Sequence, residues 1–300
     1  MLVFVSLVTG VIDISRFLWV RTERPTPAIV SAPAHIQRPV HGVPELFDLI
    51  GRSGLWQIAP DAVIPPILIA RFPPGLGRLP TGIRKKAFLH GLLPVALLIR
   101  EELSRERGAL GGILAKINLT DGLFDFSPET PWQAALNEAE QRFLADLVDK
   151  YQTNRIDELL HRVDIVPVSL ILAQAALESA WGRSRFAVAG NNLFGMRTWK
   201  NPGLVPLARD EDKQHKVASF DSLLDSVRSY VLVLNRVPAY GAFRDLRATT
   251  SDPMRLAEGL GRFSERGDAY VSDLKEIIRQ NDLQVFDGCR LGELGGQEGG

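Results

Sequence analysis

Proline is distributed unevenly along this chain of 300 residues. Eleven of its 19 prolines lie between residues 25 and 80, and the other eight are scattered over residues 94–253. Proline lacks a backbone N–H and breaks the interior of helices and sheets. The sequence therefore predicts a Pro-rich linker or extended arm over residues 21–82, in which the apolar run Val63–Phe72 forms at most an edge strand.

Apolar residues recur at helical spacing from residue 83 onward. This pattern predicts a helix over residues 83–107, with Pro94 inside it, as part of a helical extension at 83–130. A turn-rich stretch then precedes a larger domain at 131–287. Its helices are expected at 134–152, at 155–163, after a capping Asp221, after Asp252-Pro253 and at 268–281.

One segment of the larger domain has the character of β structure. Residues 203–220 place two strand-like pieces around a charged centre, which predicts a hairpin with a polar tip. Periodicity therefore predicts a mainly α (α+β) fold with a small β-hairpin lobe. The glycine-rich end, residues 288–300, is expected to be a disordered tail.

The amino terminus contains an apolar run of signal-peptide length, residues 2–12, although no basic residue precedes it. Asp13 and Arg16 interrupt it too early for a clear membrane span. We expect a signal or anchor segment at residues 1–20, with membrane anchoring through residues 2–20. An atypical anchor or a misplaced start codon would explain the missing basic residues; the alternative is a buried or lipid-facing peripheral segment.

Charge and metal-ligand content limit the possible partners. The chain has 35 basic and 35 acidic residues, so it shows no broad positive surface for nucleic acid. Its single cysteine, Cys289, and its five histidines form no paired metal-binding spacing. We therefore expect no metal and no cofactor, and a neutral glycan remains a plausible partner.

One carboxylate, Glu178, lies on the apolar side of a predicted helix. Ile171, Ala175 and Glu178 recur at i, i+4 and i+7, behind Pro167 and a possible capping Asp164. Burial and the negative end of the helix dipole both disfavour the charged form, so the pKa of Glu178 should be raised. Periodicity places Glu178 about one turn from the carboxyl end of this helix. Such an acid can protonate a leaving oxygen, although periodicity alone favours a solvent-facing glutamate beside a helix end.

The residues around Glu178 carry a family resemblance. AQAALESAWGRSRFA followed by GNNLFGMR resembles the signature of the bacterial glucosaminidases of glycoside hydrolase family 73, in particular their Bax-type branch. The similarity extends over roughly residues 60 to 285. It implies a lysozyme-like helical domain, with Glu178 as the catalytic acid.

The resemblance also implies further site residues. The hairpin of related enzymes carries a second acid, for which Asp210, Glu211 and Asp212 are candidates and Glu211 is preferred; a solvated turn is the alternative. Tyr270, Asn192 and Phe194 are the expected substrate-binding residues, with Trp199 also available as an aromatic. The alternatives are that Tyr270 is a core residue and that Phe194 supports the helix end. Of Asn191 and Asn192, one is expected to bond the backbone of the turn and the other to face the glycan. This chain departs from the family pattern in the segment GRFSERGDAY, where Phe263 or Arg262 stands at an expected tyrosine.

Together these features predict a monomeric, periplasmic or cell-envelope peptidoglycan hydrolase. It would cleave the β-1,4 bond after N-acetylglucosamine in glycan strands, with Glu178 donating the proton. Muramidase or lytic-transglycosylase chemistry, or a non-catalytic peptidoglycan-binding scaffold, are the alternatives. If the cleft lacks a second acid, the acetamido oxygen of the substrate could act as the internal nucleophile.

Overall fold

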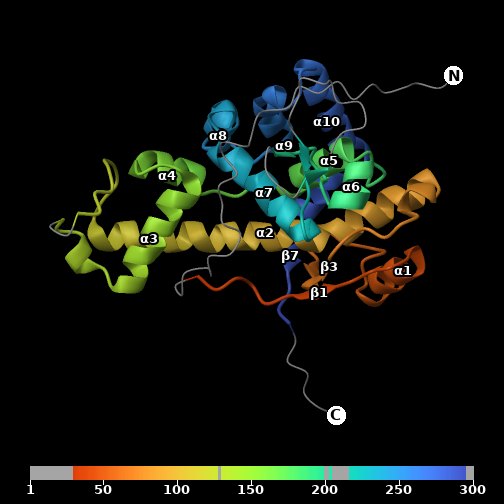
Figure 1. The fold of residues 1–300 in the computed structure, drawn as a ribbon, viewed down its shortest axis with the longest axis horizontal. Helices are drawn as coiled ribbons and strands as arrows, with labels where there is room; N and C mark the ends of the chain where they lie inside the picture. The colour runs from red at the N-terminus through yellow and green to blue at the C-terminus, as the bar shows by residue number, and fades with distance from the viewer. Residues whose placement is uncertain (1–29, 128–129, 199–202, 205–215, 295–300) are drawn as a thin grey trace, which may run out of the picture.

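Over its described residues the chain is mainly helical with three small sheets, which confirms the predicted fold class (Figure 1). The computed structural model describes residues 30–127, 130–198, 203–204 and 216–294. The α-helices are α1 (Val43–Arg52), α2 (Thr81–Ile117), α3 (Glu138–Tyr151), α4 (Ile156–Arg162), α5 (Val168–Glu178), α6 (Arg185–Gly190), α7 (Leu223–Arg236), α8 (Gly241–Arg247), α9 (Pro253–Leu256) and α10 (Asp268–Gln280). The 3-10 helices are η1 (Leu76–Arg78), η2 (Gln133–Ala135), η3 (Pro238–Tyr240), η4 (Ala257–Phe263) and η5 (Leu283–Asp287).

Helix α2 is the long axis around which the other elements pack. In Figure 1 it crosses the molecule, with α3 and α4 at one end, α7 and α8 over its middle, and α5, α6, α9 and α10 toward the other end. It continues ten residues beyond the predicted end at 107, because Leu110, Ile113 and Leu114 keep helical spacing and are buried in a second core with α3 and α4. Its earlier turns belong to the main core around α5. The predicted separation between 83–130 and 131–287 therefore does not divide the packing, because α2 contributes to both cores.

Residues between 40 and 79 contribute buried side chains to the main core, so the linker or extended arm predicted for 21–82 is wrong over this described portion. Leu46 and Ile50 of α1 are buried, as is Leu68 of β3 (Ile67–Ile69), which pairs in parallel with β1 (Ile36–Arg38). The prolines allow this because they stand at element ends: one lies in the first turn of α1, and Pro65 and Pro66 separate β2 (Val63–Ile64) from β3.

The carboxyl-terminal strand β7 (Arg290–Leu291) pairs in parallel with β2, far away in the sequence. Cys289 before it is fully buried, and Arg100 of α2 donates hydrogen bonds to the carbonyl oxygens of Asp287 and Cys289. The disordered tail predicted for 288–300 is therefore wrong for residues 288–291, because buried contacts with α2 and β2 order them. Residues 295–300 lie outside the described part of the chain.

The predicted hairpin is present in its two arms. β5 (Gly203–Leu204) pairs antiparallel with β6 (Lys216–Ala218), and β4 (Arg197–Thr198) adds a third strand on the other side of β6. The tip with Asp210, Glu211 and Asp212 lies outside the described residues, as do Trp199 and residues 1–20. Among the described helices, none combines the length and apolar character needed to cross a bilayer.

Two predicted helix caps can be compared with the observed ones. Asp252 caps α9 as predicted, by accepting a hydrogen bond from the backbone of Met254 at 3.0 Å. The cap of α7 is Ser222 and not Asp221, because the serine hydroxyl accepts the backbone N–H of Asp225 at 3.1 Å.

Candidate active site

Helix α5 carries the candidate acid out of the middle of the main core. Residues from Val168 to Ala176 are buried on every side of the helix. Its first turn is capped from the far end of the chain, since the Asp287 carboxylate accepts the Ser169 N–H at 2.9 Å and the Ser169 hydroxyl at 2.6 Å. The predicted cap Asp164 is wrong: it accepts the N–H of Ile165 at 2.8 Å and does not reach α5.

Glu178 is the last residue of α5, so the prediction that it lies about one turn before the helix end is wrong. The chain turns there through three successive residues with positive φ: Ala180 (+50°), Trp181 (+61°) and Gly182 (+75°). The left-handed region is unfavourable for the first two residues, and such strain clusters at functional sites. Gly182 also leaves no room for a side chain, because a Cβ there would lie 3.0 Å from Leu76. The turn therefore places the Glu178 carboxyl at the edge of the core.

The Glu178 carboxyl lies in a poorly solvated environment and has a raised pKa, as predicted. The residue is partly buried, and desolvation raises its pKa to about 7. A hydrogen bond from the Tyr270 hydroxyl and the positive charge of Arg266 act in the opposite direction, because both stabilise the carboxylate. Glu178 can therefore hold a proton near neutral pH and also release it.

Stacked aromatic rings form the wall beside this carboxyl. Phe194 stacks on Tyr230 with ring centroids 3.9 Å apart and planes inclined by 4°, and Phe263 stacks on Tyr270 at 5.7 Å and 12°. Phe263, one of the two residues that can stand at the tyrosine position of the family pattern, thus contributes a ring to the wall. Tyr240 lies against Phe263 at 6.1 Å and extends the wall.

The three residues expected to touch glycan are almost completely enclosed by protein. Their exposed fractions are 2% for Tyr270, 3% for Phe194 and 1% for Asn192. The Tyr270 hydroxyl donates a hydrogen bond to Glu178, and its oxygen accepts one from the Gln174 amide nitrogen at 2.8 Å. In this structure these side chains support the carboxyl and its loop, and they offer almost no surface to a sugar.

The loop after α6 is held by two asparagines, and neither side chain faces outward as one was expected to. Asn192 donates to the carbonyls of Met196 at 2.8 Å and Ala218 at 2.9 Å, while Asn191 donates to that of Phe220 at 3.0 Å. Both therefore tie the loop to the backbone of β6 and the residues after it. The loop returns to the acid at Gly195, whose φ is +67° and whose Cβ, if present, would lie 4.0 Å from Glu178 Oε2.

Some groups around Glu178 were missed by the sequence analysis. Gln174 lies one helical turn before Glu178 on the same face of α5, so its i, i+4 spacing was an available signal. Tyr230 of α7 and Arg266, just before α10, approach from distant parts of the chain, and nothing local in the sequence indicates their position. Of the two predicted catalytic residues, Glu178 is the one surrounded by these groups, and Glu211 lies outside the described residues.

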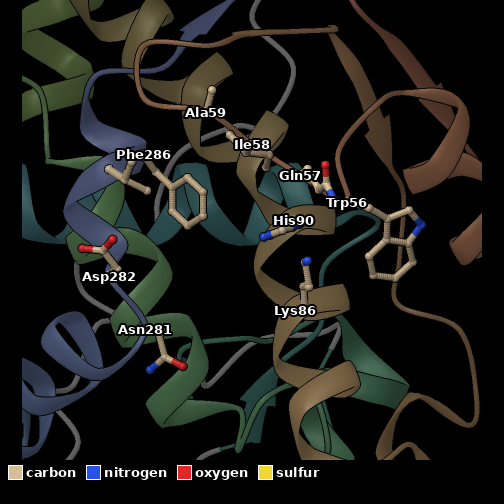
Figure 2. Close-up of a pocket in the computed structure, with 10 residues that line it drawn as sticks. Trp56, Gln57, Ile58, Ala59, Lys86, His90, Asn281, Asp282 and Phe286 are labelled. Atoms are coloured by element: carbon tan, nitrogen blue, oxygen red, sulfur yellow. The ribbon is translucent and has the colours of Figure 1, made fainter.

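A hollow in the described surface lies away from the Glu178 carboxyl. It has a volume of about 560 Å³, and Figure 2 shows it with His90 and Lys86 of α2 between Trp56 on one side and Phe286 on the other. Glu178 does not line it. Within the described ranges, no three His, Cys, Asp or Glu side chains come together in a way that could hold a metal ion.

Comparison with known proteins identifies the family of this chain. A family model described as mannosyl-glycoprotein endo-beta-N-acetylglucosaminidase matches residues 153–283. Protein bax of Escherichia coli is 35% identical over 227 residues, which cover 71% of this chain and 75% of that protein. Peptidoglycan hydrolase FlgJ of Salmonella typhimurium is 34% identical over 90 residues, or 26% of this chain and 28% of FlgJ. The catalytic domain of the autolysin Auto from Listeria monocytogenes is 25% identical, with a TM-score of 0.34 over 54% of this chain and 99% of that domain.

Proposed function

Because the chain belongs to the Bax-type branch of the bacterial glucosaminidase family, we propose that it hydrolyses peptidoglycan at the β-1,4 bond after N-acetylglucosamine, with Glu178 as the general acid. The observation that carries this proposal is the carboxyl of Glu178, partly buried at the end of α5 with a pKa of about 7. A group with this pKa is part protonated at neutral pH, which is what a proton donor to a leaving oxygen requires.

The surroundings of Glu178 support both halves of an acid's cycle. Desolvation favours the protonated form before bond cleavage. After the proton moves to the glycosidic oxygen and the C–O bond breaks, the hydrogen bond from Tyr270 and the charge of Arg266 stabilise the carboxylate that remains. A water molecule then adds its oxygen to the anomeric carbon and gives up a proton, and a proton returns to the Glu178 carboxylate to restore the acid.

Stabilisation of the oxocarbenium-like centre needs a second group, and we assign it to Glu211 on the hairpin. The support is the position of the hairpin arms: the N–H of Ala218 in β6 bonds the carbonyl of Met196 at 2.8 Å, next to Gly195 and thus next to the acid. Changing Asp210, Glu211 and Asp212 singly to their amides tests this role. If none of the three slows turnover at least about tenfold, no hairpin carboxylate is catalytic, because a positioned acid or base contributes more than that.

Product analysis of digested cell walls tests the reaction. Purified sacculi are digested with the full chain, the products are reduced with borohydride, and the reduced end sugars are identified by mass spectrometry. N-acetylglucosaminitol ends are the expected result. Reduced muramic acid ends would identify a muramidase, anhydromuramic ends a lytic transglycosylase, and absence of new ends with retained binding a scaffold; each would contradict the proposed reaction.

The proposed substrate also places the protein. Peptidoglycan lies outside the cytoplasmic membrane, so we propose a periplasmic or cell-envelope location, with residues 2–20 as anchor and a monomer as the working form. Fractionation of cells that express the full chain tests the location, and recovery in the soluble cytoplasm would contradict it.

A further inference from the structure

Gln174 is a fully buried amide on the face of α5 that carries Glu178. Both ends of the amide have a partner: Nε2 donates to the Tyr270 hydroxyl oxygen at 2.8 Å, and Oε1 accepts the hydrogen of the Tyr230 hydroxyl. A buried polar group with all its partners in place is rigid, and it transmits its orientation to those partners. Gln174 therefore sets the direction of both hydroxyl groups.

The Tyr270 hydroxyl has one hydrogen to give, and its oxygen already receives one from Gln174. Its own hydrogen is therefore directed at the Glu178 carboxyl, with which it forms a hydrogen bond. The ring itself is held by stacking on Phe263, so the hydroxyl cannot swing away.

Tyr230 fixes which way round the Gln174 amide lies. If the amide were reversed, its oxygen would accept from Tyr270, and the Tyr270 hydrogen would be withdrawn from Glu178. The buried Tyr230 hydroxyl would then lose its acceptor in the core, which costs free energy. Stacking of Tyr230 on Phe194 keeps that hydroxyl in place.

We propose that Gln174 is a positioning residue, which directs the Tyr270 hydrogen onto one oxygen of Glu178 and so leaves the acid proton on the other oxygen. This inference rests on the proposed function of Glu178. An oxygen that accepts from Tyr270 cannot also carry a hydrogen in that direction, so the transferable proton sits on the remaining oxygen. With Tyr270 holding the inner side of the carboxyl, that proton is available for a glycosidic oxygen.

The groups that face Glu178 allow a pH profile to report on this arrangement. They are Arg266 just before α10, Tyr270 in its first turn, Tyr230 of α7 and Tyr240 of η3. Burial raises the pKa of all three tyrosines, so they stay neutral where the enzyme works. Removing the hydrogen bond from Tyr270 raises the pKa of Glu178, because that bond stabilises the charged form.

The test measures kcat/KM against pH on sacculi for wild type, Gln174→Met, Tyr270→Phe and the double variant. Loss of protonated acid produces the descending limb at high pH. In Gln174→Met we expect kcat to fall about tenfold or more and the descending limb to shift to higher pH by about 0.5 pH unit or more. In the Tyr270→Phe background, Gln174→Met should add almost nothing, because it acts through the Tyr270 hydroxyl.

Ser226→Ala is the matched control. Ser226 is a buried polar residue on α7, like Tyr230, but its hydroxyl accepts the backbone N–H of Leu193 at 3.3 Å and takes no part in the Gln174 network. It should lower the melting temperature and leave the position of the limb unchanged. If Gln174→Met does not fold, Tyr230→Phe decides alone, since it keeps the stacked ring and removes the hydrogen bond that fixes the amide; we expect the same direction of shift.

Two results would overturn the positioning role. One is an unchanged limb and kcat in Gln174→Met, or in Tyr230→Phe if that variant decides. The other is an effect of Gln174→Met that is undiminished in the Tyr270→Phe background. Both are distinguishable from failure of the proposed function, because in that case the wild type would release no new N-acetylglucosaminitol ends or Glu178→Gln would keep its activity.

Discussion

Holding Glu178 with a raised pKa should destabilise the folded protein at neutral and alkaline pH. The pKa rises from an ordinary 4.5 to about 7, which corresponds to about 3.4 kcal/mol at about 1.36 kcal/mol per pH unit. Because Glu178 is still partly exposed, water reduces this penalty, and we expect about 2–3 kcal/mol. Between pH 4.5 and 7 the folded state holds a proton that the unfolded state has lost, so the stability that depends on Glu178 is present below pH 4.5 and disappears as the pH rises through 7.

Glu178→Gln removes this titration and keeps the size of the side chain. Urea unfolding of wild type and variant at pH 4.5, 6 and 8.5 measures the free energy of unfolding, and the difference between the two proteins cancels the titration of all other groups. We expect the variant to gain about 2–3 kcal/mol relative to wild type between pH 4.5 and 8.5. A difference that stays constant within about 0.5 kcal/mol over this range would refute the claim that burial raises the pKa of Glu178.

Three further perturbations test the structure around the acid. Gly182→Ala should lower the free energy of unfolding in urea by about 2 kcal/mol, because the positive φ of Gly182 and a contact of 3.0 Å both oppose a Cβ. The control is Gly108→Ala, which has open space in a helix and should be neutral or stabilising. Equal effects of the two changes would contradict this prediction. Asp287→Ala should cost about 1–2 kcal/mol by removing the cap on Ser169, and an unchanged melting temperature would argue against the cap. Burial lowers the pKa of His90 from 6.5 to about 4, so the free energy of unfolding of the wild type should fall by up to about 3 kcal/mol as the pH drops through this interval. His90→Gln should lack this loss, and parallel stability curves of the two proteins would contradict the prediction.

The features that the sequence predicted correctly depend on neighbouring residues. Helical periodicity located α3, α4 and α10 to within a few residues, and two strand-like pieces around a charged centre located β5 and β6. The raised pKa of Glu178 was predicted from its place on an apolar helical stripe, because that place indicates burial, and burial is what raises the pKa.

The features that the sequence did not predict depend on partners far away along the chain. Asp287 caps α5 from 118 residues away, and no local rule favours it over Asp164. The asparagines of the loop after α6 bind carbonyl groups of β6 and the residues that follow, which the fold alone brings near. Proline density suggested a linker before residue 82, because that rule concerns the interior of an element, and the described prolines of α1, β2 and β3 stand at their ends.

The most direct test of the central claim is the rate at which Glu178→Gln solubilises purified sacculi, compared with wild type and with Glu138→Gln. Glu138 is an exposed acid in the first turn of α3, far along the chain from the site, so it controls for the loss of one carboxylate. We expect Glu178→Gln to lose at least about 100-fold in rate while it remains folded, and Glu138→Gln to match wild type, since a general acid contributes about 100- to 10,000-fold. A Glu178→Gln protein that solubilises sacculi within about threefold of the wild-type rate would contradict the account, because such a loss is far below the contribution of a general acid.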